Sequence, residues 1–561
     1  MKASMRERDG WTLRVSPGLF GPEDRREEAG EQVSPASAGP AHCQAAAPGG
    51  TLSRMRVLAW GVFLLLAAVV PAAAQPSQIV ISQPAEATTM DPGRSTQVLT
   101  VNYFVNVYDT LTRWDTALQL VAGLATAWKS VNETTWEFML RPNVKFHDGS
   151  PFTAEDVKAT LERNMQPGKT VVTPGFTTFE AVQVVSPLTV RILTKKPDPL
   201  VPVRMAQMGS QILPARLTTD EGVKELARRP VGTGAYRLVE WVKDERLVMQ
   251  AHHDWWGWEG KAPGVERAIW KPIPDEFPRM VALEKGDVDI ITNVPPDRMK
   301  SITDGKGTKL LTVPSTRVVA LTINASQPPT SDKRVRQALA YALDVPGLIK
   351  NLYGGMGKPY SGGLADTDFG FNPALKPYPY DPVKAKALLA QAGYSNGIDV
   401  TVYFGNGTMV NDKALIEAIV DMWSKAGIRG KIEMMEMGAR QRMLNERAVP
   451  AAGFLLANPQ STLLDADGSL WRIFHPTGFN GKYWIGNQPG QRFHDLMEQA
   501  RYSLDPKKRK ALYAEATAIF HDEKPSVELF QEVVVYGVSR RVSFKPRADY
   551  RLILSEMTLA R

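Results

Sequence analysis

Three adjacent residues, His252, His253 and Asp254, carry side chains of the kinds that bind transition metals. Neighbouring residues of a strand point to opposite faces, and no other His or Cys lies near them in the sequence. We therefore expect surface or capping roles for this group, with neither a metal nor a cofactor bound to the protein.

A second group, the segment YGGMGKP around Gly355, resembles a phosphate-binding loop in composition. Such a loop needs a glycine five positions before the Gly-Lys pair and Ser or Thr directly after it. Leu352 and Pro359 occupy these two positions, so the segment does not predict nucleotide binding.

Motifs of common enzymes are missing from the sequence. It contains no Gly-x-Ser-x-Gly elbow, no His-Glu-x-x-His pair and no Ser-x-x-Lys. Asp465 and Asp467 lie close together, but their spacing alone does not indicate a glycosidase site. We expect a protein that is not an enzyme; a hydrolase is the most distant alternative, and release of product from candidate ligands would reveal it.

The elements that must position a site alternate between strands and helices. Thr153 and Asp156 have the spacing of a capping box, Asp381-Pro382 and Asp505-Pro506 are helix starts, and Gly393 is a helix end. This alternation predicts an α/β fold. Short strands are expected at residues 78–81, 190–193, 246–250, 318–323 and 400–404.

Length and composition limit the class of protein. A chain of 561 residues needs two or three folding units, and 43% hydrophobic with 22% charged residues is typical of a folded, soluble protein. The net charge of +8 is spread over 67 basic and 59 acidic residues, which gives no reason to expect nucleic-acid binding. The single cysteine excludes an internal disulfide.

The first part of the chain has the pattern of an export signal. Residues 1–54 show no apolar period and are expected to be disordered, or a spurious extension before an initiator at Met55. Residues 55–74 read as a signal peptide, whose apolar run spans about 21 Å as a helix against about 30 Å for a bilayer core. Gln75 stands where a lipid-anchored protein has Cys, so we expect a periplasmic protein without a lipid anchor.

The stretch GLATAWKSVNETTWEFMLRPNVKFHDGSPFTAEDV, which begins at Gly123, resembles the signature region of the family-five extracellular solute-binding proteins. This is the dipeptide, oligopeptide and nickel class that serves ABC importers. Further matching segments follow in the family's order: MDP from Met90, YDTLTRWD from Tyr108, PVGTGAYRLVEW from Pro230, WKPIPDEFPRMVALEKGDVDI from Trp270, RVRQALAYALD from Arg334 and YDPVKAKALLAQAGY from Tyr380.

The resemblance implies a two-lobed, periplasmic-binding-protein-like clamp with an extra subdomain inserted in the first lobe, and hinge crossings near Asn324 and Gln531. The implied boundaries are 75–115, 190–323 and 532–561 for the main lobe, 116–189 for the inserted subdomain and 324–531 for the second lobe.

Peptide binders of this family have a Trp-x-Ala-Asp segment whose carboxylate holds the ligand's ammonium group. At the corresponding positions this sequence has Leu455 for the Trp and Asn458 for the acid. An amide cannot neutralise a buried ammonium, so a free peptide N-terminus is not expected to define the ligand. A shifted alignment would instead bring Asp465 or Asp467 to that position.

Other ligand-binding residues are expected from family position and side-chain chemistry. Arg440, its neighbour Arg442 and the hinge residue Arg317 offer guanidinium forks for a carboxylate. The complete expected set is Glu86, Thr88, Arg317, Phe404, Asn406, Thr408, Arg440, Asn458 and Trp471. The cluster of Trp255, Trp256 and Trp258 is expected to pack between segments instead of binding a solute.

The resemblance implies a periplasmic receptor that captures a peptide-sized or other organic solute and delivers it to the membrane permease subunits of an ABC importer. We expect a monomer. The alternative is a solute-binding protein that acts as a periplasmic chaperone or chemosensory adaptor without its own importer. Genes for two permeases and two ATPases beside this gene would favour the receptor.

Overall fold

The computed structural model describes residues 77–560, apart from 406–408, 447, 458, 462, 477, 479–480 and 485–487. Every described residue belongs to one compact unit of the chain. The expected extension and signal peptide lie outside the described residues.

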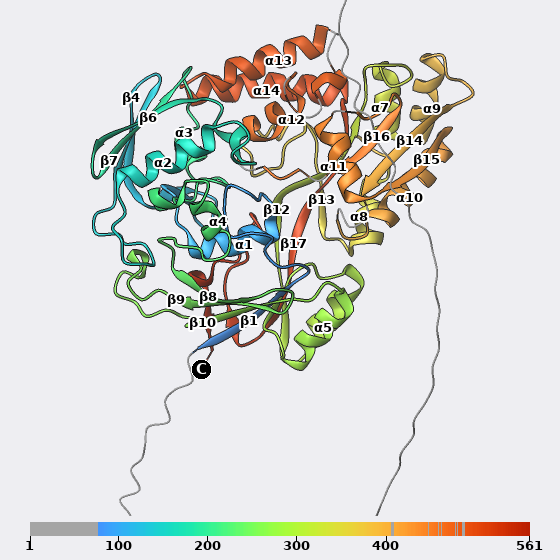
Figure 1. The fold of residues 1–561 in the computed structure, drawn as a ribbon. Coiled ribbons are helices and arrows are strands. Elements are labelled where there is room, and N and C mark those ends of the chain that lie inside the picture. Colours follow the sequence, from blue (N-terminus) through green and yellow to red (C-terminus); the bar gives the residue numbers. More distant parts are fainter. Residues whose placement is uncertain are drawn as a thin grey trace, which may run out of the picture. The chain divides into compact units, whose positions relative to one another are not determined.

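A large mixed sheet forms the centre of the described unit (Figure 1). Its strands are ordered β15-β14-β16-β12-β17-β11-β1-β10-β9-β8, and β13 pairs with β17. The strands are β1 Gln78–Gln83, β8 Tyr236–Val242, β9 Arg246–Ala251, β10 Arg267–Pro272, β11 Ile290–Ile291, β12 Thr308–Ile323, β13 Gly357–Pro359, β14 Ile398–Gly405, β15 Ile428–Met435, β16 Gly453–Ala457 and β17 Ser526–Ser539. All five strands expected from the sequence are present, four of them here and the fifth in a smaller sheet.

Two long antiparallel strands, β12 and β17, connect the two ends of this sheet. Their register shifts between Pro314 and Val318, and Val318 pairs with Gln531. Before the shift β17 has β11 as its other neighbour, and after it β12 pairs with β16. This register shift therefore lies opposite Gln531, one of the two expected hinge residues. It lies several residues before Asn324, the other one. The lobe boundaries stay a prediction.

A four-stranded antiparallel sheet, ordered β4-β5-β7-β6, lies apart from the large sheet. Phe138 and Leu140 on β5 are buried, and Trp136 is partly buried. The helix α2 packs on β6 and β7. The remaining strands are β2 Thr112–Trp114, β3 Leu120–Ala122, β4 Ala125–Asn132, β5 Thr135–Leu140, β6 Phe179–Ser186, β7 Thr189–Thr194, β18 Val542–Ser543 and β19 Thr558–Leu559.

The predicted helix ends are confirmed. The Asp156 carboxylate accepts a hydrogen bond from the backbone of the N-cap residue Thr153 at 2.8 Å. Asp381 and Asp505 are themselves N-cap residues, and their carboxylates accept from the backbone N–H groups of Lys384 and Lys507. Gly393 has a φ of +90°, which favours glycine. The α-helices are α1 Val98–Val107, α2 Ala154–Met165, α3 Val201–Arg204, α4 Gly222–Leu226, α5 Glu276–Lys285, α6 Met299–Asp304, α7 Lys333–Tyr341, α8 Val345–Tyr353, α9 Pro382–Gln391, α10 Asp412–Lys425, α11 Met437–Asn445, α12 Arg472–Phe474, α13 Gln488–Arg501 and α14 Pro506–Glu523.

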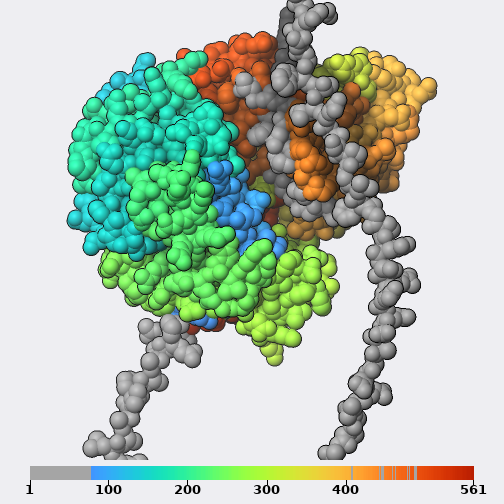
Figure 2. Space-filling model, in the orientation of Figure 1, coloured from blue at the N-terminus to red at the C-terminus, as the bar shows by residue number. Residues whose placement is uncertain are grey.

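The three largest hydrophobic cores in the described part of the chain support these elements. One lies among residues 319–530 and includes Trp423, and a second, including Trp270, joins residues 79–313 to the C-terminal segment 534–559. The third lies among residues 111–212 under the four-stranded sheet. On the face shown in Figure 2, the surface of this third part meets the C-terminal helices α13 and α14, where Lys196 lies over the ring of Tyr502.

The groups rejected as chemical sites have structural roles. Trp255 and Trp256 donate their Nε1 hydrogen bonds to Asp109 at 3.1 and 2.8 Å, so this cluster packs between segments as predicted. Lys358 of the glycine-rich segment pairs with Asp366. Within the described ranges no group of His, Cys, Asp and Glu has the arrangement of a metal site.

Candidate functional site

A cavity of about 580 Å³ is the candidate site in the described part of the chain. One side is formed by the start of α1, residues 171–175 and the segment from Arg204 to Met208. The other side is formed by β12, the end of β16, residues 463–474 and single residues of α11, α13 and α14. The two sides belong largely to different hydrophobic cores. The cavity therefore lies where independently packed parts of the chain meet.

The charged lining of this cavity is mostly basic. Among the described residues it contains one acid, Asp467, and the arginines Arg204, Arg317, Arg440, Arg472 and Arg501. Apolar side chains, among them Val318, Leu470 and Phe520, and the aromatic Trp471 and Tyr360 form much of the remaining wall. Such a mixture is typical of sites for small organic ligands.

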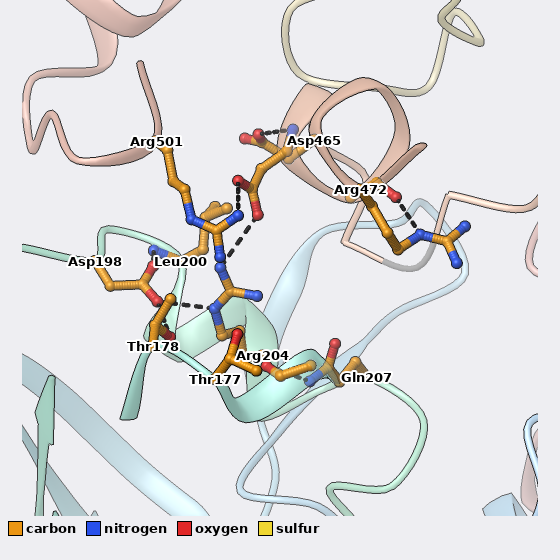
Figure 3. Close-up of polar contacts among 12 residues, drawn as sticks. Thr177, Thr178, Asp198, Leu200, Arg204, Gln207, Asp465, Arg472 and Arg501 are labelled. Atoms are coloured by element: carbon orange, nitrogen blue, oxygen red, sulfur yellow. Dashed lines mark hydrogen bonds and ion pairs between the residues drawn. The ribbon is translucent and has the colours of Figure 1, made fainter. Parts of the chain in front are cut away.

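Arg204, at the end of α3, is held by two carboxylates. Its Nε lies 2.8 Å from Asp198 and its Nη2 lies 3.1 Å from Asp467, and all three side chains are buried. Burial alone would lower the pKa of Arg204, but the two adjacent carboxylates raise it above its ordinary value. Figure 3 shows Asp198 and Arg204 joined in this way. The charge of Arg204 is thus already neutralised by the protein.

Asp467 also pairs with Arg501, whose Nη1 lies 3.2 Å from its Oδ1 without hydrogen-bond geometry. In Figure 3 the guanidinium groups of Arg501 and Arg204 converge from α13 and α3. Arg501 lies 3.5 Å over the ring of Trp471, which stacks on His475 at 4.4 Å. Burial and the nearby Arg501 lower the pKa of His475 to about 4, so its ring is neutral at pH 7.

Two further arginines are held mainly by backbone and aromatic groups. Arg472 donates from Nε to the carbonyl of Gly468 at 2.8 Å and from Nη2 to that of Gln460 at 3.4 Å. Arg317 lies 4.8 Å over the ring of Tyr550 and 3.8 Å from Glu532. The geometry of Arg317 is that of a loose ion pair, with its Nε buried and without a hydrogen bond.

Among the described arginines that line the cavity, Arg440 on α11 has the fewest protein partners. It is 8% exposed, and its Nη2 donates to the carbonyl of Leu456 at 3.1 Å. Its Nε is buried without a hydrogen-bond partner, and no acid among the described residues pairs with it. Burial lowers the pKa of Arg440 below the ordinary arginine value.

Asp465, the alternative acid for a ligand ammonium, does not line the cavity. Its carboxylate accepts hydrogen bonds from Arg509 at 2.7 Å and from the Tyr513 hydroxyl at 2.9 Å. Asp467 is shared by Arg204 and Arg501. Both acids are therefore occupied by protein cations.

The structure brings three of the expected ligand-binding residues together at the cavity: Arg317, Arg440 and Trp471. Arg442, the neighbour of Arg440 on α11, is exposed and is not part of the lining. Asn406, Thr408 and Asn458 lie outside the described residues.

Three other expected residues lie away from the cavity. Phe404 is 1% exposed and belongs to a hydrophobic core, because β14 is an inner strand covered by α10. Glu86 accepts hydrogen bonds from the Trp241 ring and the Asp244 backbone, both at 3.0 Å, and Thr88 is exposed without lining the cavity. The loop after β1 thus fixes neighbouring strands and does not reach the cavity.

Sequence reasoning missed Arg204, Arg472 and Arg501 as cavity residues. Arg204 and its partner Asp467 are 263 positions apart, and no local pattern connects them. Arg501 lies in the last turn of a helix, where basic residues are common. Its position in the sequence therefore gave no reason to expect it in the cavity.

A family model described as bacterial extracellular solute-binding proteins, family 5 Middle, matches residues 119–481. The chain belongs to this family. Its members bind solutes for ABC transporters and are not enzymes, which agrees with the expectation from the motifs. No helix in the described ranges combines the length and the apolar character that crossing a membrane requires.

Individual relatives cover most of the chain. The glutathione-binding protein GsiB of Escherichia coli K12 is 26% identical over 500 residues, which are 87% of this chain and 95% of GsiB. DppA from Helicobacter pylori, solved in complex with peptide STSA, is 25% identical with a TM-score of 0.74 over 87% of this chain and 99% of DppA. These matches confirm the predicted α/β fold of family-five binding proteins.

A third solved structure agrees in fold. The dipeptide-binding protein from Pseudoalteromonas sp. SM9913, in complex with Met-Leu, is 21% identical with a TM-score of 0.73. It covers 86% of this chain and its own full length.

Proposed function

We propose that the protein is a periplasmic receptor that captures a peptide-sized or other organic solute and delivers it to the permease subunits of an ABC importer. The observation that supports this most is the cavity of about 580 Å³, whose walls come from separately packed parts of the chain. A solute that contacts both walls stabilises the closed arrangement over an open one. The importer would then recognise the closed form.

The size and lining of the cavity favour a small ligand. Its volume lies inside the range of about 300–1,000 Å³ that is usual for small-molecule sites. Relatives are named for, or solved with, glutathione, the peptide STSA and the dipeptide Met-Leu. We take these three compounds as the first candidates for this protein.

The location and state of the protein are part of the same proposal. We propose export through residues 55–74, a mature chain that begins at Gln75 without a lipid anchor, and a monomer in the periplasm. A mass spectrum of the purified periplasmic protein tests this, because the proposed cleavage leaves Gln75 as the first residue and no lipid mass.

Native mass spectrometry of the freshly purified protein tests solute capture directly. A retained small molecule is expected, and adding it back at about one hundred times its Kd should raise the unfolding free energy by about 2.7 kcal/mol. Glutathione, STSA and Met-Leu are tested in the same melting assay, together with sugars, haem and metal chelates. If nothing is retained and no compound raises the melting temperature, the proposed function is wrong.

A pair of variants tests whether the solute binds in this cavity. Ala457→Trp puts a large side chain into the cavity wall at the end of β16, so the solute-induced rise in melting temperature should disappear. Val383→Trp on α9 is the matched control, because Val383 is 78% exposed and does not line the cavity. A rise that persists in Ala457→Trp would show that the solute binds elsewhere.

A further inference from the structure

Among the described residues, Arg440 has fewer protein partners than the other arginines of the cavity, and none of its partners is an acid. Arg204 and Arg501 share Asp467, and Arg317 lies near Glu532. Arg472 donates to two backbone carbonyls. Arg440 makes a single hydrogen bond with the described residues, from Nη2 to the Leu456 carbonyl. Only 8% of its surface is exposed.

Such an arrangement is unfavourable for the protein alone. A buried guanidinium without a counter-charge costs several kcal/mol, and buried arginines are normally paired. The Nε of Arg440 is buried and unbonded, and its Nη1 donates to no described residue. Burial also lowers the pKa of Arg440, which is the direction expected for a cation without a counter-charge. The guanidinium of Arg440 therefore has unused hydrogen-bond donors and no negatively charged partner among the described residues.

We infer that the cavity binds the carboxylate of an organic acid through the guanidinium of Arg440. This inference rests on the proposed function and narrows its ligand class to molecules with at least one carboxylate. The guanidinium is suited to this role because it presents N–H donors in a planar fork that matches a carboxylate. Free phosphate or sulfate would not use the apolar wall around it.

The rest of the cavity agrees with an anionic ligand. Its one acid among the described lining residues, Asp467, is already bound by two arginines and has no capacity for a ligand cation. Tyr360 also lines the cavity, and no described residue is hydrogen-bonded to its hydroxyl. Burial keeps the pKa of Tyr360 well above its ordinary value, so the hydroxyl remains a donor. The wall thus supplies donors, and no free carboxylate, from its described residues.

The first experiment identifies the chemistry of the retained molecule. Molecules extracted from the purified protein are treated with an esterifying reagent, and the mass gain counts their carboxyl groups. Met-Leu and its C-terminal amide are titrated in parallel, because they differ only in one carboxylate. We expect a retained molecule with at least one carboxyl group, and tighter binding of Met-Leu than of its amide.

The second experiment assigns the carboxylate to Arg440. Arg440→Gln should lose the retained molecule during purification and bind the extracted acid at least tenfold more weakly. Arg442→Gln is the matched control, since Arg442 lies on the same helix but is exposed. Without ligand, Arg440→Gln should melt at the same temperature as wild type or higher, because an uncompensated buried charge has been removed. Arg440→Lys, which keeps the charge but not the fork, should give intermediate affinity.

The outcomes separate this inference from the proposed function. A retained solute without a carboxyl group, or unchanged affinity in Arg440→Gln, overturns the role of Arg440 and leaves solute capture intact. A lower melting temperature of ligand-free Arg440→Gln with unchanged affinity shows a purely structural residue. If wild type retains nothing and binds neither Met-Leu nor glutathione nor STSA, both proposals are wrong.

Discussion

Arg204 and Asp467 form an ion pair between two parts of the chain that pack separately. Their Nη2 and Oδ2 atoms are 3.1 Å apart, and the two side chains are 4% and 3% exposed. The neighbours of Arg204, Val201 and Met205, belong to the core among residues 111–212. Ala466, next to Asp467, belongs to the core among residues 319–530. The pair therefore holds the two walls of the cavity together.

Removing this arginine should destabilise the protein strongly. Among the described residues, Arg204→Met leaves Asp198 without a cationic partner and removes one of the two arginines that pair with Asp467. Breaking a buried pair in this way costs about 3–5 kcal/mol, which urea unfolding would measure as a lower free energy of unfolding. Lys300→Ala, in the exposed pair with Asp304 on α6, is the control and should cost less than about 1 kcal/mol. A loss of under about 1 kcal/mol in Arg204→Met would contradict a structural role for the pair.

Asp368 should make the stability of the protein depend on pH. Burial, with the nearby Asp465 charge, raises its pKa to about 7, while its Oδ2 accepts a hydrogen bond from Ser469. The folded state therefore keeps a proton that the unfolded chain loses near pH 4, its ordinary value being about 3.9. The resulting stability is complete below about pH 4 and is lost as the pH rises to about 7, by about 1.4 kcal/mol per pH unit.

Urea unfolding at pH 5.5 and pH 7.5 tests this dependence in wild type and Asp368→Asn. The asparagine cannot titrate, so its unfolding free energy should fall less between the two pH values than that of wild type. Asp220→Asn, at an exposed carboxylate, serves as the control and should keep the wild-type slope. Equal slopes in wild type and Asp368→Asn would mean that this carboxyl is ionised in the folded protein.

Local features of this fold could be predicted from the sequence because they depend on a few neighbouring residues. Asp381 and Asp505 were predicted at helix starts because a proline follows each of them, and both cap their helices. Arg440 was predicted to contact ligand from its family position and its side-chain chemistry, and it lines the cavity. Its ligand contact stays a prediction.

The rest of the site could not be predicted because it depends on contacts between distant segments. Arg204 meets Asp467 across 263 positions, and the sequence around each residue has no feature that indicates the other. Phe404 was expected at the cavity because loops at strand ends commonly form clefts. The actual direction of its side chain follows from the packing of α10 against β14, which the strand pattern does not contain.

The capping interaction at α2 should contribute measurably to stability. Asp156 accepts hydrogen bonds from the Thr153 backbone and, through its other oxygen, from the Ala215 backbone, both at 2.8 Å. Asp156→Ala leaves both N–H groups without these partners and should lower the unfolding free energy by about 1–3 kcal/mol. Asp156→Asn keeps an acceptor oxygen and should recover part of the loss. An unchanged urea midpoint in Asp156→Ala would show that water replaces the carboxylate without cost.

Trp471 should report the binding of solute by its fluorescence. Its ring lines the cavity and lies 3.5 Å from the guanidinium of Arg501 and 4.4 Å from the ring of His475. A solute that enters the cavity changes the polarity around this ring, so the tryptophan emission should shift on titration with the retained molecule. Trp471→Phe should abolish most of the shift while keeping an aromatic surface. Trp241→Phe is the control, because Trp241 donates to Glu86 away from the cavity, and its loss should leave the shift unchanged. A shift of wild-type size in Trp471→Phe would place the solute away from this ring.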